Sequence, residues 1–454
     1  MKLIYGIKDR PKFAQLIVFA IQQLLAIMAA TLVVPIIIGN GMQPTAALFG
    51  AGVGTLVYVL FTKAKSPVFL GSSFAFLSSM AAAFAGAVTG GVANVSLGYV
   101  GIILGATFAG LVYVVIALIV KFAGVNWIDK LMPKQVIGPT VSIIGLSLAG
   151  NAVGDLQKGG YQVDGAPTAN VFVAIICGLV ALFVTMICSV YGKKMLKLIP
   201  FIIGILSGYA VATIFTVIGM ATGNESLMVI NFGVFNDLQI FTLPDFTFLT
   251  AIKGVKDINP EYVGMIAMAY IPVAFVVFAE HIADHKNISS IINTDLLKEP
   301  GLHRTLLGDG VGSIVGSIFG GCPNTTYGES VACVAITGNA SVYTIITAAI
   351  MAIIIAFFAP FVAFVNSIPS CVMGGICMAL YGFIAVSGLK MIQKVDLEDN
   401  KNLFTVSVIL IAGIGGLVLN FGGITITAIA TALILGIITN IILSNKKSAP
   451  AEDE

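Results

Sequence analysis

The chain contains 454 residues, of which 58% are hydrophobic and only 10% are charged, and its formal net charge is +2. Soluble globular domains carry about 25% charged residues, so this composition excludes an ordinary soluble enzyme, and the small net charge argues against nucleic-acid binding. The mean hydropathy of +1.03 and the 50 glycines instead indicate closely packed apolar helices. We therefore expect a polytopic membrane protein.

Apolar runs follow one another along the chain, and a run of about 20 apolar residues is long enough to cross a bilayer as a helix. In the first half they occupy residues 13–38, 46–61, 69–85, 98–122, 135–152, 170–191 and 198–220. In the second half they occupy residues 262–282, 306–319, 324–337, 341–363, 369–388, 403–419 and 424–444. The predicted fold class is all-α and polytopic, with fourteen transmembrane segments.

The basic residues orient these segments, because Lys and Arg concentrate in cytoplasmic loops. With the N-terminus in the cytoplasm, all but Lys158, Lys253 and Lys256 of the 23 basic residues fall on the cytoplasmic side. We expect a multi-pass protein of the cell (inner) membrane with both termini in the cytoplasm. A signal peptide is the alternative for the first run, but that run lacks a small-residue cleavage pattern.

Fourteen spans divide into two sevens, and an odd-numbered repeat inserts in opposite orientations, as in many secondary transporters. Pro133 and Pro369 are each followed five residues later by glycine at the head of an apolar run. Two irregular segments, SPVFLGSSFAFLSSM from Ser66 and CPNTTYGESVACVAITG from Cys322, each place proline before Gly, Ser and Thr. Paired segments of this kind indicate a mid-membrane site, because half-helices that begin there offer free N–H groups. Ordinary helices of weak hydropathy are the alternative.

Acidic residues inside apolar segments are candidates for function, because burying a carboxylate in a membrane is costly. Glu280 lies near the end of one run, Glu329 lies in the second irregular segment, and Asp284 follows Glu280 by four residues. Glu280 and Asp284 therefore share a face if the helix continues. Desolvation and mutual repulsion should then favour one shared, exchangeable proton. The alternative is a solvated Glu280 at the membrane boundary, paired with a neighbouring basic residue (His281, His285 or Lys286).

The remaining polar residues and motifs indicate no catalytic or metal-binding site. His281, His285 and His303 are expected around one cytoplasmic loop as solvated side chains, and the six cysteines lack metal-ligand spacing. The sequence has no phosphate-binding loop, dinucleotide motif or HExxH motif. We expect no metal site, no cofactor and no enzyme activity.

Four strings carry a resemblance to a known family: LGSSFAF (70–76), FAEH (278–281), DLLKEPGLHR (295–304) and PNTTYGES (323–330). They are similar to the bacterial uracil permeases of the nucleobase–ascorbate transporter family, and the similarity extends over essentially the whole chain. The sequence departs from the family signature where Ser330 replaces the usual Asn and Ala332 the usual Gly. Gln23 stands where many members have His.

The resemblance implies a 7+7 inverted repeat with two short antiparallel strands that lead into half-helices. A core domain would comprise residues 1–122 and 226–366, and a gate domain residues 123–225 and 367–454. Substrate would bind between them, and the core would move against the gate to alternate access. The gate domains of two copies would meet in a homodimer.

The resemblance also implies a substrate site. Glu280 and Glu329 would accept hydrogen bonds from the N–H groups of uracil, and the backbone N–H groups of Phe74 and Gly328 would donate to its carbonyl oxygens. The ring of Phe74 would stack on the base. Tyr327 would lie beside the pocket, Ser73 would support its polar network, and Glu280 with Asp284 would carry the coupling proton.

Position 284 leaves the substrate open between two classes. Asp284 is the residue of purine and xanthine members of the family, whereas Glu329 is typical of uracil permeases and purine members usually carry Gln there. Because Glu329 should touch substrate, we expect a secondary transporter that imports uracil by proton symport across the bilayer. The alternative is a xanthine or hypoxanthine permease on the same scaffold. An anion exchanger or channel would favour neutral or basic pocket groups over two carboxylates.

Overall fold

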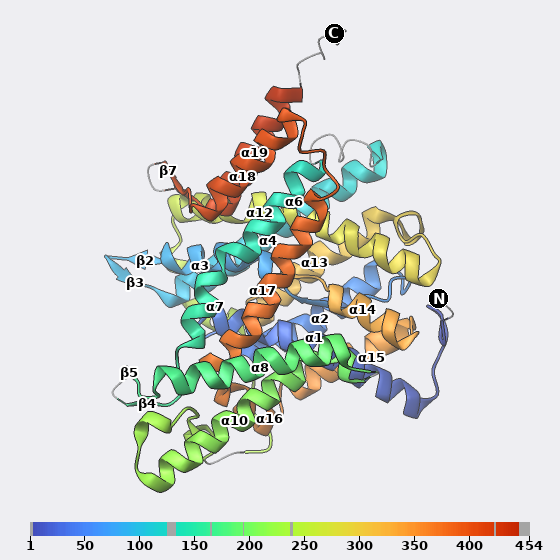
Figure 1. Cartoon of the computed structure of the whole chain (residues 1–454). Helices are drawn as coiled ribbons and strands as arrows, with labels where there is room; N and C mark the ends of the chain where they lie inside the picture. Colours follow the sequence, from blue (N-terminus) through green and yellow to red (C-terminus); the bar gives the residue numbers. More distant parts are fainter. Residues whose placement is uncertain are drawn as a thin grey trace.

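The computed structural model describes residues 3–124, 133–163, 166–193, 195–236, 239–421 and 424–444, which form a helical protein with very short strands (Figure 1). Residues 445–454, at the C-terminus that is expected in the cytoplasm, lie outside the described residues. The helices of the first half are α1 (Phe13–Ile38), α2 (Pro44–Phe61), α3 (Leu77–Ala85), α4 (Val95–Ala123), α6 (Lys134–Ser147), α7 (Ala149–Leu156), α8 (Val171–Tyr191), α9 (Met195–Leu198) and α10 (Pro200–Thr222). Those of the second half are α11 (Thr247–Gly254), α12 (Pro260–Ile292), α13 (Leu302–Gly320), α14 (Gly328–Thr337), α15 (Val342–Ile355), α16 (Ala359–Ser367), α17 (Ser370–Ile392), α18 (Asn400–Ile414) and α19 (Ala428–Ser444).

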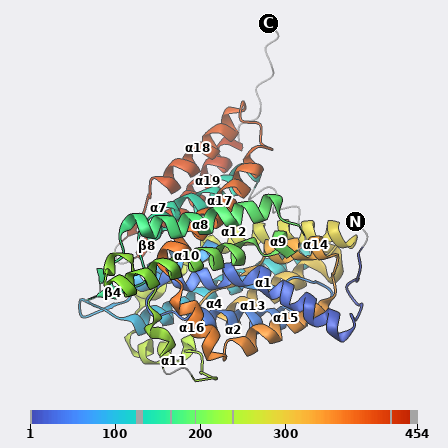
Figure 2. The same cartoon turned by 60° about the horizontal axis from the view of Figure 1, so that its bottom comes forward.

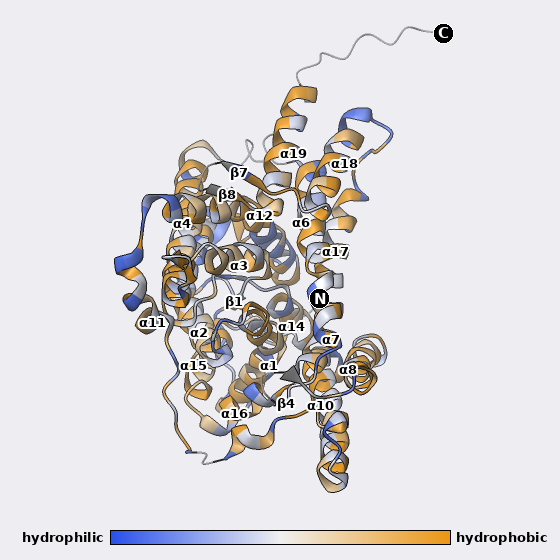
Figure 3. Ribbon diagram, turned by 90° about the vertical axis from the view of Figure 1, so that its left-hand side faces the viewer, coloured by the Kyte–Doolittle hydropathy of each residue, from blue (hydrophilic) through white to orange (hydrophobic). Residues whose placement is uncertain are grey.

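Each apolar run expected from the sequence contains a helix or a short strand followed by a helix. Within the described residues, eight helices are long and apolar enough to cross a membrane, and five shorter apolar helices accompany them. Hydrophobic residues make up most of the helical ribbon, whereas hydrophilic residues gather at loops such as the one beside α11 (Figure 3). The all-α polytopic class is confirmed, and the number of fourteen spans stays a prediction.

Two short strands from opposite halves of the chain meet inside the protein. β1 (Leu70–Ser72) pairs antiparallel with β6 (Asn324–Thr326), with Leu70 opposite Thr326 and Ser72 opposite Asn324. All six residues are buried, so their backbone groups bond within the protein, partly across the strand pair and partly to the side chains of Thr55, Ser313 and Tyr327. A 3₁₀ turn (Phe74–Phe76) and α3 follow β1, and α14 follows β6. This arrangement confirms the predicted pair of antiparallel strands with half-helices.

The other strands form two-stranded hairpins away from this crossing: β2 (Val88–Thr89) with β3 (Val92–Ala93), β4 (Gln162–Val163) with β5 (Ala166–Pro167), and β7 (Leu419–Phe421) with β8 (Ile424–Ile426).

The helices form two groups by their packing contacts; in Figure 2, α2, α13 and α15 of the first group lie low in the molecule, and α17, α18 and α19 of the second lie at the top. In the first helix group, α2 packs on α13 and α15, α4 packs on α12 and α13, and α1 packs on α15. In the second helix group, α17 packs on α6, α7 and α8, α10 packs on α8, and α18 packs on α6 and α19. Each group therefore combines segments from both halves of the chain, because α6 to α10 of the second group come between α4 and α12 of the first group in the sequence.

Glycine permits the closest helix contacts within each group. A Cβ atom placed on Gly50 of α2 would lie 2.4 Å from the carbonyl oxygen of Gly316 on α13, and one on Gly54 would lie 2.7 Å from that of Gly312. In the second group, a Cβ on Gly375 of α17 would lie 2.0 Å from the carbonyl oxygen of Gly178. Only residues without a side chain fit these crossings, which accounts for much of the high glycine content.

α12 extends ten residues beyond the apolar run that predicted it. It begins at Pro260, where the Asn259 side chain accepts a 2.8 Å hydrogen bond from the backbone N–H of Tyr262, and it ends at Ile292, after which Asn293 has the left-handed conformation. His281 and His285 are consequently helical and completely buried. The prediction of solvated histidines around a loop is therefore wrong for these two residues, because hydropathy placed the helix end too early.

Candidate functional site

A cavity with a volume of about 410 Å³ lies between the two helix groups. The first group lines it with α12, the 3₁₀ turn after β1, and the connection from β6 into α14. The second group lines it with α6, α10 and α17. All seven residues predicted for the site line this cavity: Ser73, Phe74, Glu280, Asp284, Tyr327, Gly328 and Glu329.

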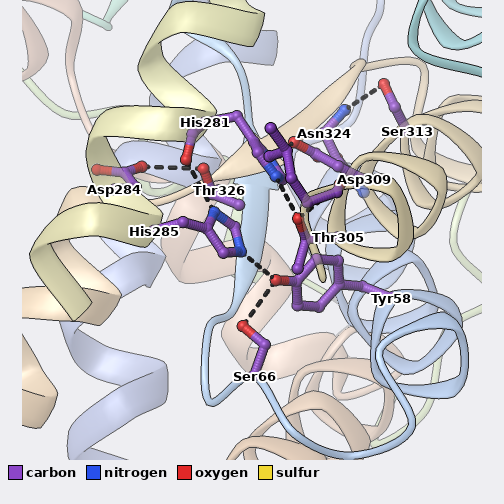
Figure 4. Close-up of polar contacts among 11 residues, drawn as sticks. Tyr58, Ser66, His281, Asp284, His285, Thr305, Asp309, Ser313, Asn324 and Thr326 are labelled. Carbon is purple, nitrogen blue, oxygen red and sulfur yellow. Dashed lines mark hydrogen bonds and ion pairs between the residues drawn. The ribbon is translucent and has the colours of Figure 1, made fainter. Parts of the chain in front are cut away.

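α12 presents two carboxylates to the cavity one helical turn apart. The side chain of Glu280 is exposed to the cavity, whereas Asp284 is partly buried and its Oδ2 accepts a 2.9 Å hydrogen bond from the Thr326 hydroxyl. β6 therefore holds Asp284 in place. The alternative pairing of Glu280 with His281 or His285 is absent from the described contacts, since both histidines bond to other groups (Figure 4).

The start of α14 supplies backbone donors and the third carboxylate. Gly328 is the first residue of the helix, and Glu329 is the second. The N–H groups in the first turn of a helix have no acceptor within that helix. A Cβ atom on Gly328 would meet only Asp284 Oδ1, at 3.8 Å, so the backbone is open toward the cavity. The end of β1 offers a similar start at Phe74.

Two of the three departures from the family pattern, Gln23 and Ser330, contact each other. Ser330 Oγ accepts a 2.9 Å hydrogen bond from the backbone N–H of Phe69 and another from the side chain of Gln23. All three residues are buried. Gln23 of α1 therefore supports the strand crossing and the beginning of α14, and it does not belong to the cavity wall.

The aromatic residues have different surroundings. Phe74 is partly exposed at the cavity, and its ring contacts Tyr381 edge-on with centroids 6.2 Å apart. Tyr327 is buried, and its hydroxyl donates a 2.6 Å hydrogen bond to the carbonyl oxygen of Ser72. Tyr327 thus contributes to the wall of the cavity while its hydroxyl is directed at β1.

The second helix group contributes an almost entirely apolar surface. Of its described lining residues only Ser387 carries a polar side chain, and the others are Ile137, Val141, Ile144, Phe201, Leu380, Phe383, Ile384 and Met391. The cavity therefore joins a polar wall to an apolar one. That combination suits a flat heterocycle that has N–H and C=O groups on its edge and an apolar face.

The charges of the cavity are unbalanced. Glu280, Asp284 and Glu329 line it, and the described lining residues include no Lys, Arg or His. Coulomb repulsion disfavours the state in which all three carboxylates are ionised. The arrangement can therefore take up protons. In the described part of the chain, no group of three or more His, Cys, Asp and Glu is arranged to hold a metal ion.

One buried polar cluster behind the cavity was missed in the sequence. Asp309 on α13 is completely buried, and its Oδ2 lies 2.7 Å from His281 Nδ1 (Figure 4). The Tyr58 hydroxyl lies 2.6 Å from His285 Nε2. Asp309 could have been found from the sequence, because it is an acidic residue inside the predicted apolar run 306–319.

Comparison with known proteins agrees with this geometry. The Permease family of xanthine and uracil permeases matches residues 14–421. The uracil permease of Bacillus subtilis is 38% identical over 99% of this chain and 98% of its own. The uracil permease of Escherichia coli is 34% identical over 95% of this chain and 92% of its own. These relatives are transporters, in line with the expectation that the protein is not an enzyme.

Solved structures agree on the fold. The transmembrane domain of the cyanobacterial bicarbonate transporter BicA superposes with a TM-score of 0.65 at 16% identity, covering 96% of this chain and 99% of that one. The murine anion transporter Slc26a9 in its inward-facing state gives 0.64 at 12% identity, covering 96% and 69%. At such identities the likeness concerns the fold alone. With the family match over most of its length, the chain belongs to the xanthine/uracil permease family.

Proposed function

We propose that this protein imports uracil by proton symport. The observation that carries the proposal is that Glu280 and Glu329 line one cavity together with the helix starts at Phe74 and Gly328. The Glu329 carboxylate accepts one N–H group of uracil through a charge-assisted hydrogen bond, which is stronger than a neutral one, and the carbonyl oxygen of protonated Glu280 accepts the other. The free backbone N–H groups complement its carbonyl oxygens. The uracil permeases among the relatives support this substrate.

The proton enters the proposal through the unbalanced carboxylates. A proton on Glu280 from the outside reduces repulsion with Glu329 and Asp284, so the site accepts uracil. Loss of that proton to the cytoplasm restores the repulsion, and uracil leaves. The gradient thereby drives import.

Alternating access follows from the two helix groups. The core domain (1–122 and 226–366) would move against the gate domain (123–225 and 367–454), so that the cavity opens first to one side and then to the other. The apolar surface contributed by α6, α10 and α17 supports this, because apolar surfaces slide without breaking hydrogen bonds. The proposal includes the cell membrane as location, both termini in the cytoplasm, and a homodimer through the gate domains.

A second candidate is a permease for xanthine or hypoxanthine. It is favoured by Asp284, which lines the cavity and faces Gly328, and a cavity of this volume also has room for a two-ring base. Equilibrium binding of labelled uracil to the purified protein, with unlabelled xanthine as competitor, separates the candidates. We expect uracil to bind and an equal concentration of xanthine to leave it bound. Displacement by xanthine would favour the purine permease.

A further inference from the structure

α12 has two polar faces, and the mechanism above uses only one. Glu280 and Asp284 line the cavity, whereas His281 and His285 point away from it toward α2 and α13 (Figure 4). Both histidines are completely buried, as is Asp309. A buried ion pair seldom stabilises a protein more than apolar residues of the same size, so stability does not explain this cluster. Ionisable residues in such positions are candidates for function.

The hydrogen bonds of His281 define where its protons lie. Thr305 Oγ1 donates to the carbonyl oxygen of Leu302 at 3.0 Å, so its oxygen is free to accept from His281 Nε2, also at 3.0 Å. Nε2 therefore carries a hydrogen. On the other side of the ring, Nδ1 lies 2.7 Å from Asp309 Oδ2. A hydrogen bond of this length needs one proton, held either by Asp309 as a carboxylic acid or by His281 as an imidazolium.

His285 is a neutral neighbour that does not compete for this proton. Its Nδ1 lies 2.8 Å from the carbonyl oxygen of His281, which can only accept, so Nδ1 carries the hydrogen. Its Nε2 then accepts from the Tyr58 hydroxyl at 2.6 Å. The two imidazole rings stack with centroids 4.0 Å apart, a spacing at which two positive charges would repel strongly. An imidazolium therefore forms at His281 only while His285 stays neutral.

The surroundings contain several acids and no described cation. On α12, Glu280 is next to His281 and Asp284 is three residues further on, and both interact electrostatically with Asp309. Glu280 and Asp284 also interact electrostatically with Glu329 of α14. α2 contributes the Tyr58 hydroxyl, and α4 contributes Tyr113, whose ring lies edge-on to His281 with centroids 6.3 Å apart. Asp309 Oδ1 has no hydrogen-bond partner among the described residues. The proton shared with His281 is thus the only compensation that the described structure gives to the Asp309 carboxylate.

We propose that His281 and Asp309 form a proton-sharing pair that positions charge for the coupling residue Glu280. When Glu280 is ionised, the proton moves from Asp309 Oδ2 to His281 Nδ1, and the imidazolium stabilises the neighbouring carboxylate. When Glu280 is protonated, the proton returns to Asp309 Oδ2. The net charge of the pair never changes, but a positive charge is present on α12 only while His281 holds the proton. The pair thereby eases the release of the coupling proton, and this inference rests on the proposed proton symport.

The sharpest test is Asp309→Asn. The Asn side chain can donate a hydrogen bond to His281 Nδ1, so the contact between α12 and α13 is kept, but no proton can move to His281. Ionised Glu280 then loses a stabilising positive charge. We expect the alkaline limb of proton-driven uracil uptake to move upward by about one pH unit, the effect of one nearby charge. Uracil affinity at acidic pH, where Glu280 is protonated in both proteins, should stay within about twofold of wild type, since differences below about 0.4 kcal/mol correspond to such a factor.

Tyr113→Phe is the matched control, because Tyr113 also contacts His281 and its hydroxyl has no hydrogen-bond partner among the described residues. It should keep the wild-type pH profile. His281→Gln offers a second route if Asp309→Asn fails to fold, because it removes the basic nitrogen that receives the proton, and it should shift the alkaline limb in the same direction.

The outcomes separate the two proposals. A wild-type pH profile in the folded Asp309→Asn and His281→Gln proteins, or a shift toward lower pH, would overturn the proton-sharing pair and leave it a structural contact. A wild-type protein that shows no proton-driven uptake would instead contradict the proposed function. Uptake profiles of all four proteins in proteoliposomes, from about pH 5 to about pH 9, cover the titration range of such groups.

Discussion

The Tyr327 hydroxyl donates a 2.6 Å hydrogen bond to the backbone carbonyl of Ser72 and thereby ties the start of α14 to the end of β1. These residues come from opposite halves of the chain, and both are buried. The bond lies directly beside the pair β1–β6, from which both half-helices begin. It therefore fixes the distance between the two sets of backbone donors that the proposed uracil site requires.

Tyr327→Phe should lower the stability of the protein. The Ser72 carbonyl loses its partner while it remains buried, which costs about 1–3 kcal/mol. Thermal unfolding in detergent measures the effect. Tyr343→Phe is a suitable control, since the Tyr343 hydroxyl accepts a hydrogen bond from Arg10 in an exposed position. Equal unfolding temperatures for the two variants would contradict the importance given to the Ser72 contact.

Gly50→Ala should destabilise the crossing of α2 and α13. The new methyl group would lie 2.4 Å from the carbonyl oxygen of Gly316, so the helices must move apart at a cost of about 1–3 kcal/mol. Gly150→Ala, also in a helix, is the control, because nothing lies within 4 Å of its added methyl group. The measurements are the yield of folded protein and the unfolding temperature of each variant. If neither differs between the two variants, the crossing tolerates a wider spacing.

Glu329→Gln should weaken uracil binding. The amide keeps the size of the side chain, but it replaces a charged acceptor with a neutral one, and hydrogen bonds to charged groups contribute about 1.5–3 kcal/mol. We therefore expect an affinity loss of about tenfold to about hundredfold, measured by equilibrium binding. Unchanged uracil affinity would remove Glu329 from the site. A gain of xanthine binding in the same variant would show that this position also selects the base.

Glu280→Gln should separate binding from coupling. Glutamine resembles the protonated carboxylic acid, so uracil can still bind and exchange across the membrane, but no proton leaves this position. Proteoliposomes should retain counterflow of labelled uracil and lose uphill uptake driven by a proton gradient. Uphill uptake at the wild-type level would transfer the coupling role to another carboxylate, of which Asp284 is the nearest candidate along α12.

Much of the site could be predicted because its residues interrupt apolar patterns. Glu280 and Glu329 are acids in apolar surroundings, and the Gly, Ser and Thr runs around Phe74 and Gly328 mark irregular backbone at membrane depth. The hydropathy that defined the fourteen apolar runs likewise reflects the medium around the helices, so it is readable without any tertiary information.

The cluster behind the cavity could not be predicted in the same way. Hydropathy ends the eighth run at residue 282, whereas α12 extends to Ile292, with His285 bonded to Tyr58 of α2 and Ile288 and Ile292 packed in an apolar cluster with residues of α14. Pairing of His281 with Asp309 joins residues from two helices. Such partners depend on helix rotation and packing, which the local pattern of a single sequence does not contain. The contact of Gln23 with Ser330 was hidden for the same reason.

Uptake of labelled uracil into proteoliposomes, with and without an inward proton gradient and in the presence of excess xanthine, tests the central proposal most directly. The proposal predicts accumulation that requires the gradient and is indifferent to xanthine. Accumulation that is independent of the gradient would contradict proton symport. Strong inhibition by xanthine, or no uptake of uracil, would contradict the assignment of the substrate and make Asp284 the better guide to it.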